Sequence, residues 1–124
     1  MCLSSDSEKP TKGSFLTVMD CDRSSLHRQM WHLTDLNELK LGGSLCLDAY
    51  KGARLMKCDM QRSYQEWRRT GKSRLQLYNS ASGMCLSAQS ASAEETGTYD
   101  VAMEVCDESF AHLWKFVNRT ATDT

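Results

Sequence analysis

Residues 46 to 67 read CLDAYKGARLMKCDMQRSYQEW, and the order of features in this stretch decides the fold. It opens with Cys-Leu-Asp, continues to a second cysteine followed by aspartate, and ends in Gln-x-Trp. Cys-Leu, a second cysteine followed by aspartate, and a tryptophan occur in this order three times along the chain, and the residue two before the tryptophan is Gln29, Gln65 or His112. The first cysteines are Cys2, Cys46 and Cys85, the second are Cys21, Cys58 and Cys106, and the closing tryptophans are Trp31, Trp67 and Trp114. Such self-similarity indicates a chain built from three like units.

The units have a period of about 40 residues, which helical repeats and propeller blades share. Helical repeats need amphipathic stretches of ten or more residues, whereas the apolar runs here are short and alternate with polar residues. Runs at Leu39–Leu41, Leu75–Tyr78 and Val101–Val105 predict short strands. Three units of about four strands predict an all-β chain that closes as a β-trefoil, which leaves few exposed sheet edges.

The predicted domain covers residues 1–124, with repeat one at 1–38, repeat two at 39–74 and repeat three at 75–124. Repeats two and three have a strand and a turn before their Cys-Leu, whereas only Met1 precedes Cys2. We therefore expect the first strand of repeat one to lie outside this chain.

Composition fits one soluble domain and excludes several partners. Of 124 residues, 40% are hydrophobic, and 15 basic residues face 16 acidic ones, for a net charge of -1. A chain with this balance has no overall attraction to nucleic acid or to an anionic membrane. No apolar stretch approaches the length that a membrane-spanning helix requires. We therefore expect neither nucleic acid nor membrane among the partners of this segment.

Six cysteines predict disulfides formed in an oxidising compartment. Zinc is the alternative, but no two cysteines stand in the close pairs typical of zinc sites. One pairing repeats within every unit: Cys2 with Cys21, Cys46 with Cys58, and Cys85 with Cys106. The sequon Asn118-Arg119-Thr120 is a candidate N-glycosylation site and agrees with a secretory route.

The threefold order of Cys-Leu, second cysteine and closing tryptophan, with Cys-Leu-Asp and Gln-x-Trp complete in repeat two, resembles the ricin-type (R-type) lectin β-trefoil. Within that family, residues 43–48 (GSLCLD), 82–86 (SGMCL) and 113–116 (LWKF) look most like the C-terminal lectin domain of polypeptide N-acetylgalactosaminyltransferases. The resemblance implies a module that binds GalNAc- or galactose-bearing glycans or glycopeptides. It would steer a catalytic domain in cis within the secretory pathway, in the Golgi lumen or outside the cell. The chain itself needs no cofactor by this reading, while the absent transferase domain would use a divalent metal, Mn.

A galactose-type site needs a carboxylate for sugar hydroxyls, a side-chain amide and an aromatic face. In the family the carboxylate follows Cys-Leu, and only repeat two has it, as Asp48. Gln65 is the expected supporting amide. Met56 stands where the family often has an aromatic residue, so Tyr50 or Tyr64 is the candidate for the aromatic face. Asp48 could instead cap a turn, and the two tyrosines could simply pack on the surface or in the core.

The other repeats have serine at the anchor position, Ser4 in repeat one and Ser87 in repeat three, so at most one working sugar site is expected. A degenerate trefoil that serves as a structural or protein-interaction domain, without sugar binding, remains the alternative function. A third possibility is the carbohydrate-binding module of a glycosidase.

No catalytic or metal site is predicted in this chain. Asp20-Cys21-Asp22 spells a metal-binding Asp-x-Asp, but the other repeats do not keep the first aspartate, and Cys21 is expected in a disulfide. Whether the parent protein is an enzyme rests on the resemblance alone, which points to a glycosyltransferase. Basic residues concentrate in repeat two, where a solvated face competes with an anionic partner as the explanation. They are Lys51, Arg54, Lys57, Arg62, Arg68, Arg69, Lys72 and Arg74.

Overall fold

The computed structural model describes residues 2–50, 52–58, 63–70, 76–89, 98–107 and 114. These residues form short strands, with one helical turn and two 3-10 turns. Repeat one contributes β1 (Cys2–Ser5), β2 (Leu16–Met19), η1 (Arg23–Ser25), α1 (Leu26–Gln29) and β3 (Trp31–Leu33). Repeat two contributes β4 (Leu39–Leu41), β5 (Leu45–Asp48), β6 (Arg54–Lys57), η2 (Ser63–Gln65) and β7 (Arg68–Thr70). Repeat three contributes β8 (Gln76–Asn79), β9 (Met84–Gln89) and β10 (Tyr99–Glu104).

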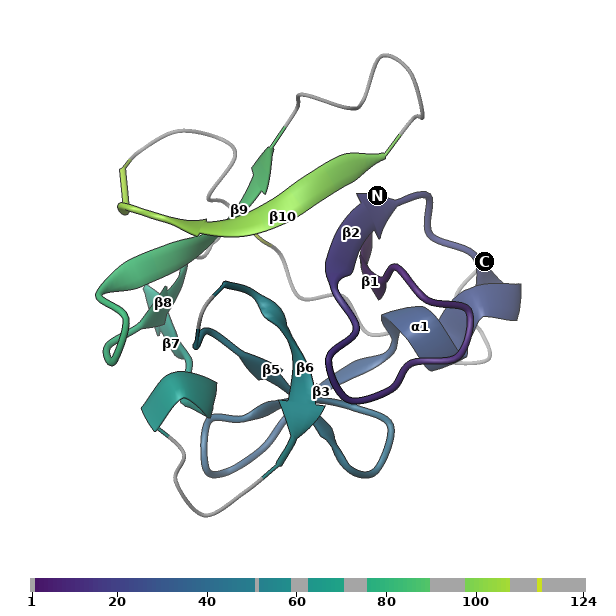
Figure 1. The fold of residues 1–124 in the computed structure, drawn as a ribbon, viewed down its shortest axis with the longest axis horizontal. Coiled ribbons are helices and arrows are strands. Elements are labelled where there is room, and N and C mark those ends of the chain that lie inside the picture. Colours follow the sequence, from purple (N-terminus) through teal and green to yellow (C-terminus); the bar gives the residue numbers. More distant parts are fainter. Residues whose placement is uncertain are drawn as a thin grey trace.

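The hairpins of the three repeats lie around a common centre, with β1 and β2 at the right of Figure 1, β5 and β6 at the bottom, and β9 and β10 at the top. Each repeat holds an antiparallel hairpin in the same register. Cys2 faces Met19 in β1 and β2, Cys46 faces Met56 in β5 and β6, and Cys85 faces Glu104 in β9 and β10. The predicted repeat is therefore present in the backbone pairing.

Neighbouring repeats are joined through the strand that follows each Gln-x-Trp motif. β3 pairs with β4 across the first junction, and β7 pairs with β8 across the second. β10 returns to pair with β2, which links repeat three to repeat one. The sheets run β1-β2-β10-β9-β8-β7 and β3-β4-β5-β6. This cyclic pairing is the β-trefoil that the sequence predicts.

The core lies where inward-facing residues of all three repeats meet. Its buried members are mostly leucines from the hairpins, together with Trp67, whose side chain is fully buried. They are Leu16, Leu39, Leu41, Leu47, Ala49, Ala53, Leu55, Trp67, Leu77 and Leu86. Trp31 and Trp114 pack against this cluster from its edge. The predicted packing of the three tryptophans into the barrel is confirmed.

The three disulfides join the cysteines that the repeat pairs: Cys2 with Cys21, Cys46 with Cys58, and Cys85 with Cys106. Their Cα atoms lie 5.0, 5.1 and 5.1 Å apart, within the usual range for disulfides. All six cysteines are used, which removes the thiolates that a zinc site would need. Among the described residues, no helix is both long and apolar enough to cross a bilayer.

Candidate functional site

The site that the sequence predicts lies on the outer face of the β5–β6 hairpin. Side chains alternate between the two faces of a strand, and residues opposite each other in a ladder share a face. Leu47 and Leu55 face each other and both belong to the core. Their neighbours Asp48 and Arg54, also opposite each other, therefore project from the other face.

Asp48 ends β5 and holds its carboxylate in a fixed position. Its Oδ1 accepts a hydrogen bond from the Tyr50 backbone N–H at 2.7 Å, and its Oδ2 accepts one from Gln65 Nε2 at 3.0 Å. The first bond is the turn cap that competes with the sugar-anchor reading, and the structure shows that Asp48 makes it. A carboxylate accepts about four hydrogen bonds in all. The cap therefore leaves acceptor capacity on a side chain that is 9% exposed.

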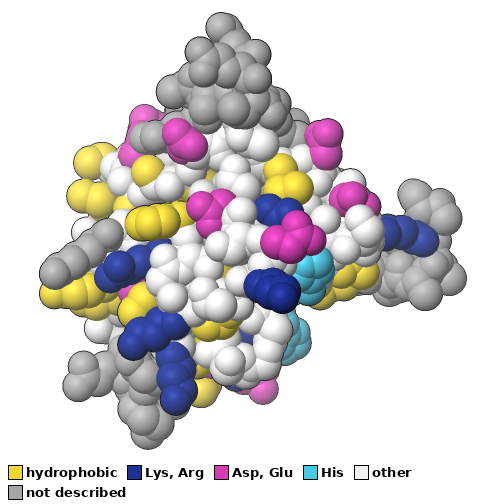
Figure 2. Space-filling model, turned by 45° about the vertical axis from the view of Figure 1, so that its right-hand side comes forward, with side chains coloured by type: hydrophobic (Ala, Val, Ile, Leu, Met, Phe, Trp, Pro, Cys, Tyr) yellow, Lys and Arg dark blue, Asp and Glu magenta, His cyan; other side chains and the backbone are white. Residues whose placement is uncertain are grey.

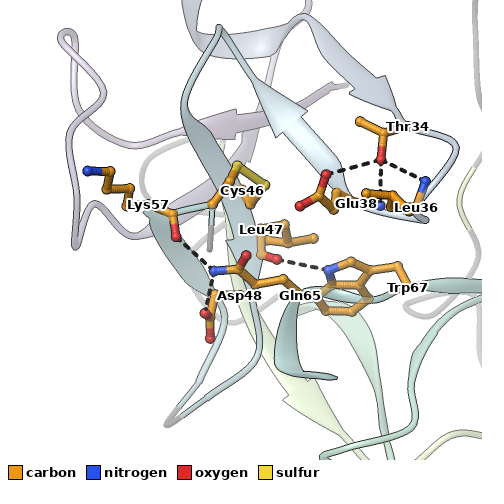
Figure 3. Close-up of a disulfide and its surroundings, with 10 residues drawn as sticks. Thr34, Leu36, Glu38, Cys46, Leu47, Asp48, Lys57, Gln65 and Trp67 are labelled. Atoms are coloured by element: carbon orange, nitrogen blue, oxygen red, sulfur yellow. Dashed lines mark hydrogen bonds between the residues drawn. A yellow bond between two sulfur atoms is a disulfide. The ribbon is translucent and has the colours of Figure 1, made fainter. Parts of the chain in front are cut away.

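Gln65 stands behind Asp48 and is only 1% exposed. Its Nε2 donates to Asp48 Oδ2 and also to the Lys57 carbonyl oxygen at 3.0 Å, so both amide hydrogens are used within the protein (Figure 3). A group in this position orients the carboxylate. The role of Gln65 as the supporting amide stays a prediction, and in this structure its two amide hydrogens are directed to Asp48 and to the Lys57 carbonyl oxygen.

The same glutamine in repeat one explains why the residue recurs. Gln29 Nε2 donates to the Asp20 carbonyl oxygen at 2.9 Å, and Gln29 Oε1 accepts from the Asp22 N–H at 2.9 Å. Asp20 and Lys57 both precede the second cysteine of their repeats, so the two glutamines tie the same strand end to the Gln-x-Trp turn. Among the described residues, Gln65 makes a bond to a carboxylate that Gln29 in repeat one lacks. The counterpart in repeat three, His112, lies outside the described residues.

Tyr50 and Tyr64 are in contact, with ring centroids 5.0 Å apart and ring planes at 62°. Tyr64 packs against the core, and its carbonyl oxygen accepts from the Ala49 N–H at 2.9 Å. Tyr50 is 48% exposed. Both line an open groove of about 560 Å³, whose other walls include Phe15 and residues of repeat three. Asp48 is not part of that lining, so the edge-to-face pair stands beside the carboxylate and borders the groove.

Each closing tryptophan makes one hydrogen bond that is the same in all repeats. The indole Nε1 of Trp31 donates to the Leu3 carbonyl oxygen at 2.8 Å, and that of Trp67 donates to the Leu47 carbonyl oxygen at 2.9 Å. Trp114 repeats this bond to Leu86 at 3.0 Å. The acceptor is always the leucine of Cys-Leu. In each repeat, this hydrogen bond therefore ties the closing tryptophan to the strand that carries Cys-Leu.

The serines at the anchor position of the other repeats are buried and differ in their contacts. Ser4 donates through its hydroxyl to the Cys2 carbonyl oxygen at 3.0 Å. The hydroxyl oxygen of Ser87 is buried with no hydrogen-bond partner among the described residues. Neither offers a charged acceptor at the surface. This is the reason to expect no sugar site there.

Sequence reasoning counted Arg54 among the basic residues of repeat two but did not place it beside Asp48. Arg54 begins β6 directly opposite Asp48, and its Nε is buried without a hydrogen-bond partner in the described part of the chain. The signal was present in the sequence. If residues 45–48 and 54–57 are the two strands of a hairpin and Cys46 stands opposite Met56, then Arg54 stands opposite Asp48.

Two further clusters of possible metal ligands have other partners in the structure, and the last candidates lie outside the described residues. Asp22 of the Asp-x-Asp motif caps η1 by accepting from the Ser24 N–H at 3.0 Å, and this backbone hydrogen bond holds the pKa of Asp22 below 3.8. Glu38 lies with Cys46 and Cys58 in an arrangement close enough for a metal, but both sulfurs form a disulfide. Asn118 and the basic residues Lys51, Arg62, Lys72 and Arg74 lie outside the described residues.

Comparison with known proteins agrees with this architecture. The structure is similar to a chain in the crystal structure of the Haemophilus ducreyi cytolethal distending toxin, with a TM-score of 0.75 and 16% sequence identity, over 99% of this chain and 87% of that one. At that identity the likeness shows the β-trefoil fold alone. The family model of the ricin-type β-trefoil lectin domain matches residues 1–119. The chain therefore belongs to the ricin-type β-trefoil lectin domain family, whose domains bind carbohydrates.

Proposed function

We propose that this domain binds GalNAc- or galactose-type glycans through a single site in repeat two, with Asp48 as its anchor. The observation that carries the proposal is the carboxylate of Asp48 itself, held at the end of β5 by the Tyr50 N–H and by Gln65. A carboxylate fixed in this way can accept hydrogen bonds from two adjacent sugar hydroxyls without first losing side-chain freedom. Repeats one and three have serine at this position.

The other predicted residues take supporting roles in this proposal. Gln65 orients Asp48 from behind, because its amide hydrogens are committed to Asp48 and to the Lys57 carbonyl oxygen. Tyr50 offers the exposed aromatic surface beside the anchor, and Tyr64 supports its ring edge to face. A single shallow contact of this kind binds weakly, in the range of about high micromolar to millimolar.

A narrower role follows from the sequence signatures that resemble polypeptide N-acetylgalactosaminyltransferases. In that role the domain directs a catalytic domain in cis toward peptides that already carry GalNAc, in the Golgi lumen. The three disulfides support a place in the secretory pathway or outside the cell. Tighter binding of a GalNAc-serine peptide than of the same peptide without sugar would support this role. Equal binding of the two peptides would contradict it.

The proposed site is tested by titrating the oxidised domain with methyl α-GalNAc and methyl galactoside, for wild type and Asp48→Asn. Asn keeps the size of the side chain and an oxygen for the turn cap, but it loses the charged acceptor. Ser87→Ala is the matched control, because it changes the same position in repeat three. We expect Asp48→Asn to lose binding and Ser87→Ala to keep it. Equal binding by all three proteins would contradict the site, and no response from any would favour the degenerate trefoil.

A further inference from the structure

We propose that Arg54 is a ligand-binding residue of the Asp48 site and that it makes the site prefer glycans with an acidic group, a carboxylate or a sulfate, next to the anchored ring. The inference rests on the proposed function, since it needs Asp48 as the anchor. The sequence leaves open whether the basic residues of repeat two face solvent or an anionic partner. The inference assigns one of them, Arg54, to the sugar site itself.

The position of Arg54 follows from strand pairing. It is the first residue of β6 and stands opposite Asp48, the last residue of β5. Opposite residues in an antiparallel ladder have Cβ atoms about 4.5 to 5.5 Å apart on the same face. A sugar ring bound on Asp48 would therefore lie within reach of the guanidinium.

The charge of Arg54 is not neutralised by Asp48. The described residues contain no ion pair between them, and the contacts of Asp48 are those from the Tyr50 N–H and Gln65 Nε2. Arg54 Nε is buried and has no acceptor among the described residues. Buried donors are nearly always paired in folded proteins, so an unpaired one beside a candidate anchor calls for an explanation. The Nε hydrogen itself is out of reach of a ligand, but Arg54 as a whole is only half-buried, so an acidic oxygen on a bound glycan would accept from the terminal Nη1 and Nη2 groups of the guanidinium.

The trefoil does not need an arginine at this position. The equivalent of Arg54 is Thr17 in repeat one, opposite Ser4, and Ala102 in repeat three, opposite Ser87. Both hairpins form in the same register without a charge. The repeat with a carboxylate on β5 is thus also the repeat with a guanidinium on β6, which is the pairing expected of a ligand site.

The described part of repeat two exposes more basic than acidic side chains, and this charge balance favours an anionic ligand over a cationic one. Lys57 at the end of β6 is exposed, and Arg68 at the start of β7 is exposed, with a single ion pair to Glu66 at 3.8 Å. Figure 2 shows Lys and Arg side chains gathered at the lower left of the face drawn, beside hydrophobic side chains. Guanidinium groups match carboxylate and sulfate oxygens with paired hydrogen bonds. Asp48 would repel an anion placed directly on it, so the ring belongs over Asp48 and its acidic substituent over Arg54.

The test compares methyl galactoside, its 3-sulfate and 3′-sialyllactose as ligands of the oxidised domain, by NMR titration at physiological salt. The proteins are wild type, Arg54→Gln, and Arg54→Thr, which copies repeat one. Arg68→Gln is the control for general charge, because it removes an exposed arginine from β7. Dispersed amide spectra establish that each variant is folded.

We expect at least one acidic sugar to bind wild type roughly tenfold or more tighter than methyl galactoside. Both Arg54 variants should lose that gain, so that they bind acidic and neutral sugars about equally. Arg68→Gln should keep the gain, because it removes only an exposed charge. Response to the sulfate alone or to the sialic acid alone identifies the source of the acidic group. Equal binding of acidic and neutral sugars would overturn the inference while leaving the Asp48 site intact. An equal loss in Arg68→Gln would also overturn it.

Discussion

The bond between Gln65 and Asp48 predicts a measurable coupling between two buried side chains. Gln65→Met keeps the length of the side chain but removes the N–H donors to Asp48 Oδ2 and to the Lys57 carbonyl oxygen. Hydrogen bonds to charged groups contribute about 1.5 to 3 kcal/mol and those between neutral groups about 0.5 to 1.5 kcal/mol. We therefore expect Gln65→Met to lower the free energy of unfolding by about 2 to 4 kcal/mol.

A double-mutant cycle isolates the bond to the carboxylate. Once Asp48 is replaced by alanine, Gln65→Met no longer removes a bond to a carboxylate, while every other effect of the substitution is common to both backgrounds. The cycle should therefore give a coupling of about 1.5 to 3 kcal/mol. The assay is urea unfolding of the oxidised proteins, followed by tryptophan fluorescence.

The matched control is the same pair in repeat one, Ser4→Ala with Gln29→Met. Ser4 bonds to the Cys2 carbonyl oxygen and Gln29 to the Asp20 carbonyl oxygen, so these two side chains share no hydrogen bond. Their effects should add to within about 0.5 kcal/mol. A coupling below about 0.5 kcal/mol for the repeat-two pair would refute the role of Gln65 in holding Asp48.

Three further outcomes follow from single contacts. Ser87→Ala removes a buried hydroxyl without a partner and should leave stability unchanged or raise it, whereas Ser4→Ala loses a bond and should cost about 1 kcal/mol; equal costs in urea unfolding would contradict this. Trp67→Phe leaves the Leu47 carbonyl oxygen unpaired in the core and should lower the free energy of unfolding by about 2 to 4 kcal/mol. A loss below about 1 kcal/mol would contradict a structural role for this hydrogen bond. The Ser24 N–H lowers the pKa of Asp22, so the ionised carboxylate stabilises the folded chain at pH values above the pKa of Asp22 in the unfolded chain. This stabilisation is lost as the pH falls through the lower pKa of Asp22 in the folded chain. An NMR titration that gives Asp22 a pKa at or above the ordinary value of an aspartate would contradict this prediction.

The fold could be predicted from the sequence because every repeat shows the same functional groups in the same order. Cysteines at equivalent positions fixed the disulfide pairing, and tryptophans at equivalent positions fixed the core. The repeated bond from each indole N–H to the leucine of Cys-Leu explains why these residue types recur together. The one-turn helix α1 after the first Cys-Asp was not predicted, because four residues leave too little pattern in the sequence.

The site was predictable only in part. The position of Asp48 follows from its motif, but the use of its oxygens depends on what folds behind it. Gln65 was expected to contact sugar, although the presence of Gln29 in a repeat without a carboxylate already pointed to a structural role. The contact between Tyr50 and Tyr64 joins two elements across an intervening strand and loop, and no local pattern indicates it. The sequence showed Arg54 only as one of several basic residues, because its place opposite Asp48 depends on the register of the hairpin.

The most direct test of the central claim, one carbohydrate site in repeat two, is to map amide shifts on the oxidised domain as methyl α-GalNAc is added. The account predicts saturable shifts at the end of β5, above all for the Tyr50 amide, whose N–H donates to Asp48. The equivalent amides after Ser4 and Ser87 should not move. Shifts centred on those serines, or no saturable shift in repeat two at tens of millimolar sugar, would contradict it.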